Sequence, residues 1–161
     1  MKEKAKKIKM HITDVDGVMT DGGMYFSSTG EEMKRFSARD GMAVGICRDH
    51  GIEYGIISAG HSLKLVEARA KVLKVEHVYV GYTPKIQILN EWMIKFNLKA
   101  EEIAYIGDDL TDIEVMNTVG LSACPADAAK KAKENADIVL SKNGGYGCIR
   151  EFVEDYLVGS R

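Results

Sequence analysis

Short apolar runs alternate with longer amphipathic segments along the whole chain. The short runs are typical of buried strands, and they cover residues 8–13, 54–58, 78–80, 103–106, 121–123 and 138–140. The amphipathic segments are typical of helices, and they cover residues 41–50, 61–73, 84–96, 111–119, 126–134 and 147–157. Strands that alternate with helices predict an α/β fold of the Rossmann-like, doubly wound kind, with a mainly parallel sheet covered on both faces.

One segment departs from this alternation directly after the first strand. Met24–Phe26 and Met33–Phe36 flank the turn sequence Ser28-Thr29-Gly30-Glu31, which predicts a β-hairpin. No internal repeat and no linker rich in Pro, Gly or Ser interrupts the 161 residues. We therefore expect one domain over residues 1–161.

Composition and charge exclude several classes of protein. The net charge of −2 gives no basic surface for nucleic acid or an anionic membrane. The three cysteines are far apart and form no CxxC pair, which favours a reducing compartment over a zinc site or a disulfide framework. The basic start MKEKAKK precedes an apolar run that is too short for a signal core or a membrane span. We expect a cytoplasmic protein with a solvated N-terminal tail.

Polar side chains gather where the predicted strands end. Asp14 and Asp16 end the first strand, and Ser58 ends the second. Lys85 begins the helix after the third strand, and Gly107-Asp108-Asp109 follows the fourth, with Asp112 close behind. In open parallel sheets, ligands bind outside the carboxyl ends of the strands. These groups are therefore expected along one edge of the sheet.

Asp14 and Asp16 raise an electrostatic question. Side chains two apart on a strand share a face, so the two carboxylates would be neighbours if the strand continued through them. Two carboxylates in a partly desolvated site repel each other, and one pKa would rise. A hard divalent cation removes this conflict, and Mg²⁺ is typically held by few protein carboxylates together with water and substrate phosphate. The pattern therefore predicts a Mg²⁺ site.

The ordered set DVDGV (14–18), Ser58, Lys85 and GDDLTD (107–112) resembles the four motifs of the haloacid dehalogenase superfamily of phosphotransferases. The resemblance implies that Asp14 is the nucleophile and becomes an aspartyl phosphate, while Asp16 is the general acid and then the general base. It also implies that Mg²⁺ lies between the Asp14 carboxylate, the Asp16 backbone carbonyl and Asp108. Further roles follow from the same motifs: Ser58 would bind a phosphoryl oxygen, Lys85 would neutralise the transferred group, Asp109 would support the metal through water, and Asp112 would orient Lys85.

The spacing between motifs leaves no room for the cap domain that usually covers the substrate in this superfamily. Together with DVDGVMTDGG, the hairpin, ARAKVLKV (68–75) and the tail GGYGCIREFVEDYL, this makes the chain similar to the 3-deoxy-D-manno-octulosonate 8-phosphate phosphatase family and its relatives. That resemblance implies a substrate that is a phosphorylated 2-keto-3-deoxy sugar acid. It also implies a homotetramer in which the hairpin helps assembly and neighbouring subunits complete the active sites.

The loop Ser58-Ala59-Gly60-His61-Ser62 departs from the family's eight-carbon members, which usually have Gly-Arg after the second-motif residue. A 9-phosphorylated sialic-acid-type sugar therefore stays an alternative substrate. Gly60, His61 and Arg69 are candidate substrate contacts, and Arg69 could form a bidentate contact with the sugar carboxylate. The segment Gly144–Gly147 is either a tail that reaches a neighbour's site or a strand-to-helix loop. A non-catalytic tetramerisation module is disfavoured because the nucleophile and metal ligands are present.

Overall fold

Six parallel strands form the centre of the protein in a computed structural model that describes residues 2–159. The strand order is β5-β4-β1-β6-β7-β8, so β1 lies in the middle and the order reverses beside it. The strands are β1 (Met10–Thr13), β4 (Glu53–Ala59), β5 (His77–Gly81), β6 (Ile103–Ile106), β7 (Leu121–Cys124) and β8 (Ile138–Val139). The expected Rossmann-like α/β fold is confirmed, and every pairing in the sheet is parallel.

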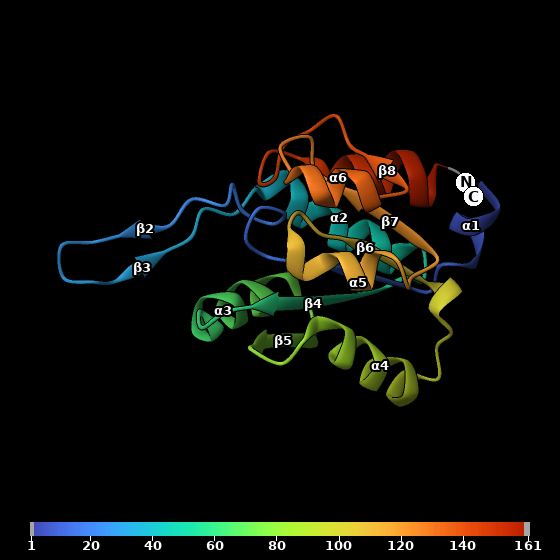
Figure 1. Cartoon of the computed structure of the whole chain (residues 1–161), viewed down its shortest axis with the longest axis horizontal. Helices are drawn as coiled ribbons and strands as arrows, with labels where there is room; N and C mark the ends of the chain where they lie inside the picture. Colours follow the sequence, from blue (N-terminus) through green and yellow to red (C-terminus); the bar gives the residue numbers. More distant parts are fainter. Residues whose placement is uncertain (1, 160–161) are drawn as a thin grey trace.

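Helices cover both faces of this sheet (Figure 1). One face packs against α2 (Ala38–Asp49), α3 (Leu63–Leu73), α7 (Cys148–Glu151) and the π-helical segment η3 (Phe152–Val158). The other face packs against α4 (Lys85–Phe96), α5 (Ile113–Met116) and α6 (Lys130–Asn135). Two 3₁₀ turns, η1 (Ala100–Glu102) and η2 (Leu110–Asp112), precede β6 and α5.

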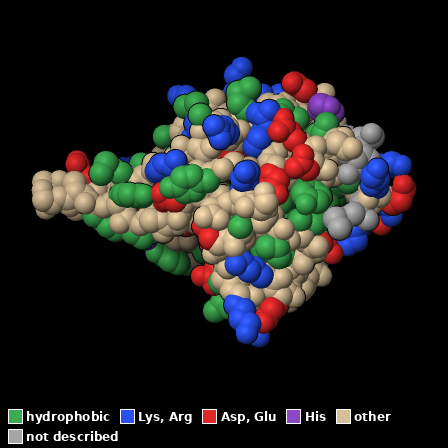
Figure 2. Space-filling view, turned by 90° about the horizontal axis from the view of Figure 1, so that it is seen from above, with side chains coloured by type: hydrophobic (Ala, Val, Ile, Leu, Met, Phe, Trp, Pro, Cys, Tyr) green, Lys and Arg blue, Asp and Glu red, His purple; other side chains and the backbone are tan. Residues whose placement is uncertain are grey.

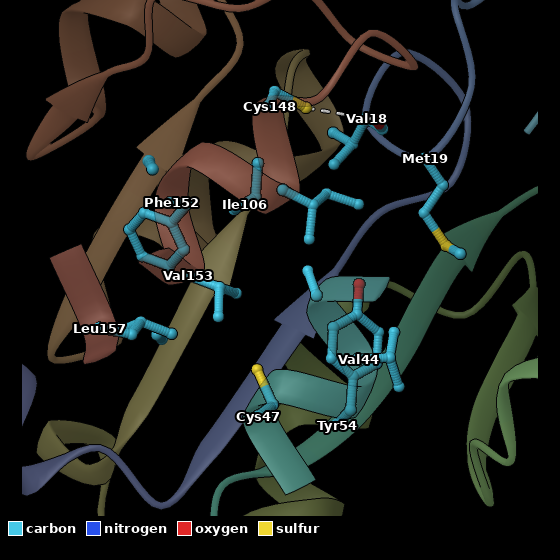
Figure 3. Close-up of a cluster of buried hydrophobic side chains, with 14 of the residues drawn as sticks. Val18, Met19, Val44, Cys47, Tyr54, Ile106, Cys148, Phe152, Val153 and Leu157 are labelled. Atoms are coloured by element: carbon cyan, nitrogen blue, oxygen red, sulfur yellow. Dashed lines mark hydrogen bonds between the residues drawn. The ribbon is translucent and has the colours of Figure 1, made fainter. Parts of the chain in front are cut away.

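Two apolar cores hold these layers together, one on each side of the sheet. In the first core, the C-terminal helix places Cys148, Phe152 and Leu157 against α2 and the central strands (Figure 3). The Cys148 thiol donates a hydrogen bond to the Val18 carbonyl at 3.4 Å, which joins the end of the chain to the loop after β1. Because that loop carries Asp14 and Asp16, the packing of the C-terminal helix supports the polar edge of the sheet.

Several predicted segments differ from the observed ones. The N-terminal basic segment is a short helix, α1 (Lys2–Lys7), and not a solvated tail, because Ala5 is buried and the lysines pair with acidic residues. The helix predicted over 111–119 divides into η2 and α5, and the helix over 126–134 is reduced to α6. Asp109 caps the start of η2 by accepting the Leu110 N–H at 2.7 Å.

The predicted hairpin is present as β2 (Tyr25–Phe26) and β3 (Glu32–Met33), and it projects from the body as a long arm (Figure 1). At its base, Thr20 and Phe36 form an antiparallel bridge. After it, Ser37 begins α2 by accepting the Asp40 N–H at 3.3 Å. None of the helices in residues 2–159 is both long and apolar enough to cross a bilayer.

Candidate active site

The three central strands end beside one another and bring the predicted groups together. Parallel pairing of β4 and β6 with β1 aligns their carboxyl ends. Asp14 follows β1, Ser58 lies near the end of β4, and Asp108 follows β6 after one glycine. The Asp14 N–H donates to the Ile106 carbonyl at 3.0 Å, which fixes the start of the first loop against the next strand. This is the edge where open α/β sheets bind ligands.

Asp14 is a buried carboxylate with a partner on each oxygen. Its Oδ1 accepts the Val15 N–H at 2.6 Å, and its Oδ2 lies 2.7 Å from the Lys85 ammonium. Lys85 is the first residue of α4, and its side chain is 1% exposed. A lysine buried this deeply is expected only where carboxylates surround it. The ion pair between Asp14 and Lys85 is therefore what compensates the burial of this lysine.

Asp112 organises the groups around Lys85. Its Oδ1 accepts the Lys85 ammonium and the Tyr105 hydroxyl, each at 2.6 Å. Its Oδ2 accepts the backbone N–H groups of Asp108 and Asp109 at 2.9 and 3.1 Å. Asp112 is fully buried, so these four donors satisfy a carboxylate that solvent does not reach. Asp112 thus contacts Lys85 directly and also binds the backbone of the loop that carries Asp108.

Asp108 is held close to the β1 loop by the absence of a side chain at Gly17. A Cβ at Gly17 would lie 2.0 Å from Asp108 Oδ2, and Gly17 has a φ of +83°. Thr20 fixes this loop, since its hydroxyl accepts the N–H groups of Gly17 and Gly22 at 3.3 and 3.2 Å. Glycine is required here for both the backbone conformation and the close approach.

Two acids of this cluster have pKa values well above the ordinary value of an aspartate. Burial raises the pKa of Asp14 to about 7, with Lys85 opposing the rise and Asp112 adding to it. Burial likewise raises the pKa of Asp108 to about 8, and repulsion from Asp14 and Asp112 contributes. Burial acts to lower the pKa of Lys85, but attraction to Asp14 and Asp112 outweighs it and the pKa is raised. One lysine does not neutralise three carboxyl groups.

The donor set fits a hard divalent cation. Oxygen atoms of Asp14, Asp108 and Asp112 lie within 4.8 Å of one another. The two Asp112 oxygens together accept four hydrogen bonds, whereas each Asp14 oxygen has one partner, so Asp14 and Asp108 have more capacity left for a metal. The Asp108 carboxylate accepts no hydrogen bond from residues 2–159. Carboxylate oxygens that lack a positive partner are typical ligands of Mg²⁺.

Asp16 lies outside this acidic cluster, because the condition for Asp14 and Asp16 to share a face, a strand that continues through both, is not met. Strand β1 ends at Thr13 and residues 16–19 form a turn, so the alternation of a strand does not extend to Asp16. Its carboxylate instead pairs with Lys34 of the hairpin, with Nζ and Oδ1 at 2.6 Å. Burial acts to lower the pKa of Lys34, but Asp16 and Glu32 outweigh it and raise that pKa.

The loop after β4 carries Ser58 and the candidate substrate contacts Gly60 and His61. Ser58 is buried, and within the described chain its hydroxyl has no hydrogen-bond partner. The Gly60 N–H donates to the Gly81 carbonyl at 3.1 Å, which ties the loop to the end of β5. The side chain of His61 is exposed, and its Nε2 lies 3.9 Å from Oε2 of Glu32 in the hairpin. The loop and the hairpin therefore meet beside the site.

Arg69 is placed further along α3, away from the acidic cluster. Its Nη2 donates to the Ser37 carbonyl at 3.1 Å, and its guanidinium lies 5.5 Å from the centre of the Phe36 ring. Its buried Nε has no hydrogen-bond partner in residues 2–159. Arg69 thus joins α3 to the start of α2, and a substrate contact for it stays a prediction.

The segment Gly144–Gly147 is a strand-to-helix loop packed on its own subunit's site. A Cβ at Gly144 would lie 1.8 Å from the Gly17 carbonyl oxygen, so the two loops are in direct contact. The Gly145 N–H donates to the Val18 carbonyl at 2.9 Å, and Asp40 accepts the Gly147 N–H at 3.0 Å. These residues therefore form the strand-to-helix loop, and a contact between them and a neighbouring subunit stays a prediction.

Two residues of the site were missed in the sequence. Tyr105 lies in the apolar run IAYI, in which its hydroxyl is the only polar side-chain group. A buried tyrosine hydroxyl usually needs a hydrogen-bond partner, and this was the available signal for Tyr105. Burial raises the pKa of Tyr105 well above its usual value, and the nearby Asp112 adds to this. Lys34 is two residues after Glu32, and strand alternation places both on one face of the hairpin. That alternation was the available signal for Lys34.

Comparison with known proteins agrees with this geometry. Residues 73–151 match the haloacid dehalogenase-like hydrolase family. The 3-deoxy-D-manno-octulosonate 8-phosphate phosphatase KdsC of Escherichia coli K12 is 41% identical over 148 residues, which cover 92% of this chain and 78% of that protein. The Yersinia pestis phosphatase of the same name is 40% identical over 149 residues, covering 92% and 79%.

Solved structures share the fold over nearly the whole chain. The 3-deoxy-D-manno-octulosonate 8-phosphate phosphatase from Moraxella catarrhalis, in complex with a magnesium ion, a phosphate ion and a KDO molecule, has a TM-score of 0.94 at 32% identity. It covers 99% of this chain and 91% of its own. The Yersinia pestis structure has a TM-score of 0.90 at 37% identity, covering 98% and 88%. This chain belongs to the capless haloacid dehalogenase-like hydrolases, in the family of phosphoric monoester hydrolases that contains the 3-deoxy-D-manno-octulosonate 8-phosphate phosphatases.

Proposed function

We propose that this protein is a Mg²⁺-dependent phosphatase that hydrolyses a phosphorylated 2-keto-3-deoxy sugar acid, with 3-deoxy-D-manno-octulosonate 8-phosphate as the preferred substrate. The observation that carries the proposal is the buried Asp14–Lys85 pair next to Asp108, at the ends of adjacent strands. The names of the relatives at about 40% identity support the eight-carbon sugar and do not favour the nine-carbon alternative.

In the proposed mechanism, the Asp14 carboxylate attacks phosphorus and forms an aspartyl phosphate. Asp16 gives a proton to the leaving alkoxide and then takes one from the water that hydrolyses the intermediate. Lys85 and the Ser58 hydroxyl bind phosphoryl oxygens, and Asp112 keeps Lys85 in place. The contacts of two groups support these roles: Lys85 is fixed by two carboxylates, and the buried Ser58 hydroxyl has no partner in the described residues.

A bound Mg²⁺ would neutralise phosphoryl oxygens and reduce repulsion between the phosphate and the acids of the site. The Asp14 and Asp108 carboxylates and the Asp16 backbone carbonyl would hold it, with Asp109 supporting the site through water. The raised pKa values of Asp14 and Asp108 support this assignment, because burial and mutual repulsion disfavour these carboxylates' negative charge and one lysine does not offset it.

We further propose a homotetramer whose neighbouring subunits complete the active sites. The hairpin arm presents Met24, Tyr25, Phe26 and Met33, each more than 40% exposed, and hydrophobic side chains lie along the arm in Figure 2. An exposed apolar arm of this kind is expected to pack against another chain. In that assembly, Gly60, His61 and Arg69 would contact the sugar.

Two simpler expectations accompany this proposal. Residues 1–161 are proposed to be one domain, since a single sheet spans Met10 to Val139. A cytoplasmic location is proposed because the three cysteines are buried and lie far apart in the sequence.

The test is phosphate release with Mg²⁺, with and without EDTA, from a panel of alkyl phosphates. The panel contains 3-deoxy-D-manno-octulosonate 8-phosphate, N-acetylneuraminate 9-phosphate, its deaminated analogue and simple hexose phosphates. We expect the eight-carbon acid to be the best substrate and EDTA to abolish release. Asp14→Asn should be inactive, while Asp49→Asn, which removes an exposed acid at the end of α2, should be unchanged. Full Mg²⁺-dependent activity in Asp14→Asn would refute the aspartyl-phosphate route.

A further inference from the structure

We propose that Lys34 of the hairpin is a positioning residue that holds the Asp16 carboxylate in place for proton transfer. The inference rests on the proposed function, in which Asp16 serves as general acid and then as general base. None of the roles assigned to the four motifs includes Lys34, which lies in the segment between the first and second motifs.

The burial of Lys34 is the first observation. Its side chain is 1% exposed although it comes from a projecting hairpin whose apolar residues are open to solvent. Burying a lysine ammonium is costly unless carboxylates compensate it. Two do so: Asp16 Oδ1 at 2.6 Å and Glu32 Oε1 at 3.1 Å. Lys34 is therefore fixed in one position and not a mobile surface lysine.

The second observation is how this lysine is anchored on its far side. Both oxygens of Glu32 accept the Ser62 hydroxyl, at 2.8 and 2.7 Å. Ser62 lies in the loop that follows Ser58 and precedes α3. The chain Asp16–Lys34–Glu32–Ser62 thus links the loop after β1 to the loop after β4 across the site. Lys34 cannot move away from Asp16 without breaking contacts on both sides.

The third observation is the asymmetry of the Asp16 carboxylate. Lys34 engages Oδ1, and Oδ2 has no hydrogen-bond partner in the part of the chain that the structure describes. An acid that transfers a proton must be within hydrogen-bond reach of the reacting oxygen in a fixed orientation. An ion pair on one oxygen fixes the carboxylate plane and leaves the other oxygen for the proton.

If Lys34 acts through proton transfer by Asp16, its loss should matter only for leaving groups that need a proton. As the P–O bond breaks, the proton of Asp16 goes to the alkoxide of a sugar phosphate and yields an alcohol. p-Nitrophenolate is a stable anion and leaves without that proton. Loss of Lys34 should therefore slow transfer from alkyl phosphates and leave transfer from p-nitrophenyl phosphate nearly unchanged.

Single-turnover release of the leaving group measures this first step for both kinds of substrate. For Lys34→Met we expect release from the best alkyl phosphate of the panel to fall about 30-fold, and release of p-nitrophenolate to change by less than about threefold. The matched control is Lys9→Met, which removes an exposed ion pair with Glu102 at the opposite edge of the sheet and should change neither rate. Equal losses with both leaving groups would overturn the inference.

Two further measurements separate positioning from general support of the fold. Asp16→Asn and the double variant Asp16→Asn/Lys34→Met should release the alkyl leaving group at the same rate, since Lys34 acts only through Asp16. Independent, multiplying losses would count against the inference. Lys34→Cys alkylated with 2-bromoethylamine restores an ammonium of similar reach, and it should recover alkyl-phosphate transfer. Position 34 is as buried as the native thiols, so the introduced thiol is alkylated in urea before refolding, in a background whose three native cysteines are replaced by alanine.

The inference and the proposed function fail in different ways. An active Asp14→Asn would remove the aspartyl-phosphate mechanism and the inference together. An inactive Asp14→Asn, combined with equal losses for both leaving groups in Lys34→Met or with no recovery after alkylation, would remove only the role of Lys34.

Discussion

Replacing Asp108 with Asn should stabilise the metal-free protein while it destroys metal binding. The carboxyl of Asp108 has a pKa of about 8 in the folded protein and 3.8 in its ordinary state, because burial and the neighbouring Asp14 and Asp112 disfavour its charge. A carboxyl with a raised folded pKa binds its proton more tightly in the folded state. The stabilisation that the protonated Asp108 gives to the folded state is therefore full below pH 3.8, and it is lost as the pH rises through the folded pKa.

The size of the effect follows from the two pKa values. Between pH 3.8 and pH 7 the Asp108 carboxyl removes up to ~4 kcal/mol of folding free energy, at about 1.4 kcal/mol per pH unit. An amide of the same shape carries no such charge. Because Asp14 shares the repulsion, we expect Asp108→Asn to raise the free energy of unfolding in EDTA by about 2–4 kcal/mol at pH 7 and by almost nothing at pH 4.

Urea denaturation in EDTA at pH 4, 5.5, 7 and 8 tests this expectation, with the same series repeated in excess Mg²⁺. Added Mg²⁺ should stabilise the unmodified protein, because a ligand that binds only the folded state shifts the equilibrium. It should not stabilise Asp108→Asn. Asp49→Asn serves as the control for loss of an exposed acid. A stability change that is the same at pH 4 and pH 7 would refute the reasoning, since repulsion requires the ionised carboxylate.

Three other predictions test separate features. Burial lowers the pKa of His11 to about 3, so the unmodified protein should lose about 1.4 kcal/mol of stability for each pH unit below 6.5. In denaturation experiments, His11→Phe should not show this loss of stability at low pH. Gly17→Ala should abolish activity and weaken Mg²⁺ binding in titration calorimetry, because the added Cβ would displace Asp108. Gly51→Ala is the control, since Gly51 has a similar positive φ but no atom within 4 Å of the added Cβ. This control should lose about 1 kcal/mol of stability and keep full activity. Lys85→Met should lower the free energy of unfolding by about 3–5 kcal/mol because Asp14 and Asp112 lose a buried counter-charge; a loss below about 1 kcal/mol would contradict this.

The sheet and the catalytic edge were predictable because each depends on a local signal. Apolar runs such as Ile103–Ile106 must be buried, and the residues that follow them must lie at the edge. Strands β1, β4 and β6 therefore bring Asp14, Ser58 and Asp108 to this edge. Lys85 could be expected there because it begins the helix after a strand.

The remaining contacts depend on side chains that meet across long stretches of sequence, and no periodicity encodes them. The position of Asp16 depends on a turn at residues 16–19 and on a lysine eighteen residues later. The placement of the Gly144 loop depends on the surface of the β1 loop. The helical N-terminus depends on where its lysines find acids, such as Glu101 for Lys7. Each was settled by tertiary packing and charge.

In the hairpin segment from Glu32 to Phe36, alternate residues point to two different surfaces. Glu32 and Lys34 face the reaction edge, whereas Met33 and Arg35 are open to solvent. A substitution scan along this strand should therefore show a period of two, with turnover sensitive at one set of positions and association between copies at the other. Inserting or deleting one residue would exchange the sets and remove both properties together. Evolution can vary either surface by point substitution, but it cannot change the length of this segment by a single residue.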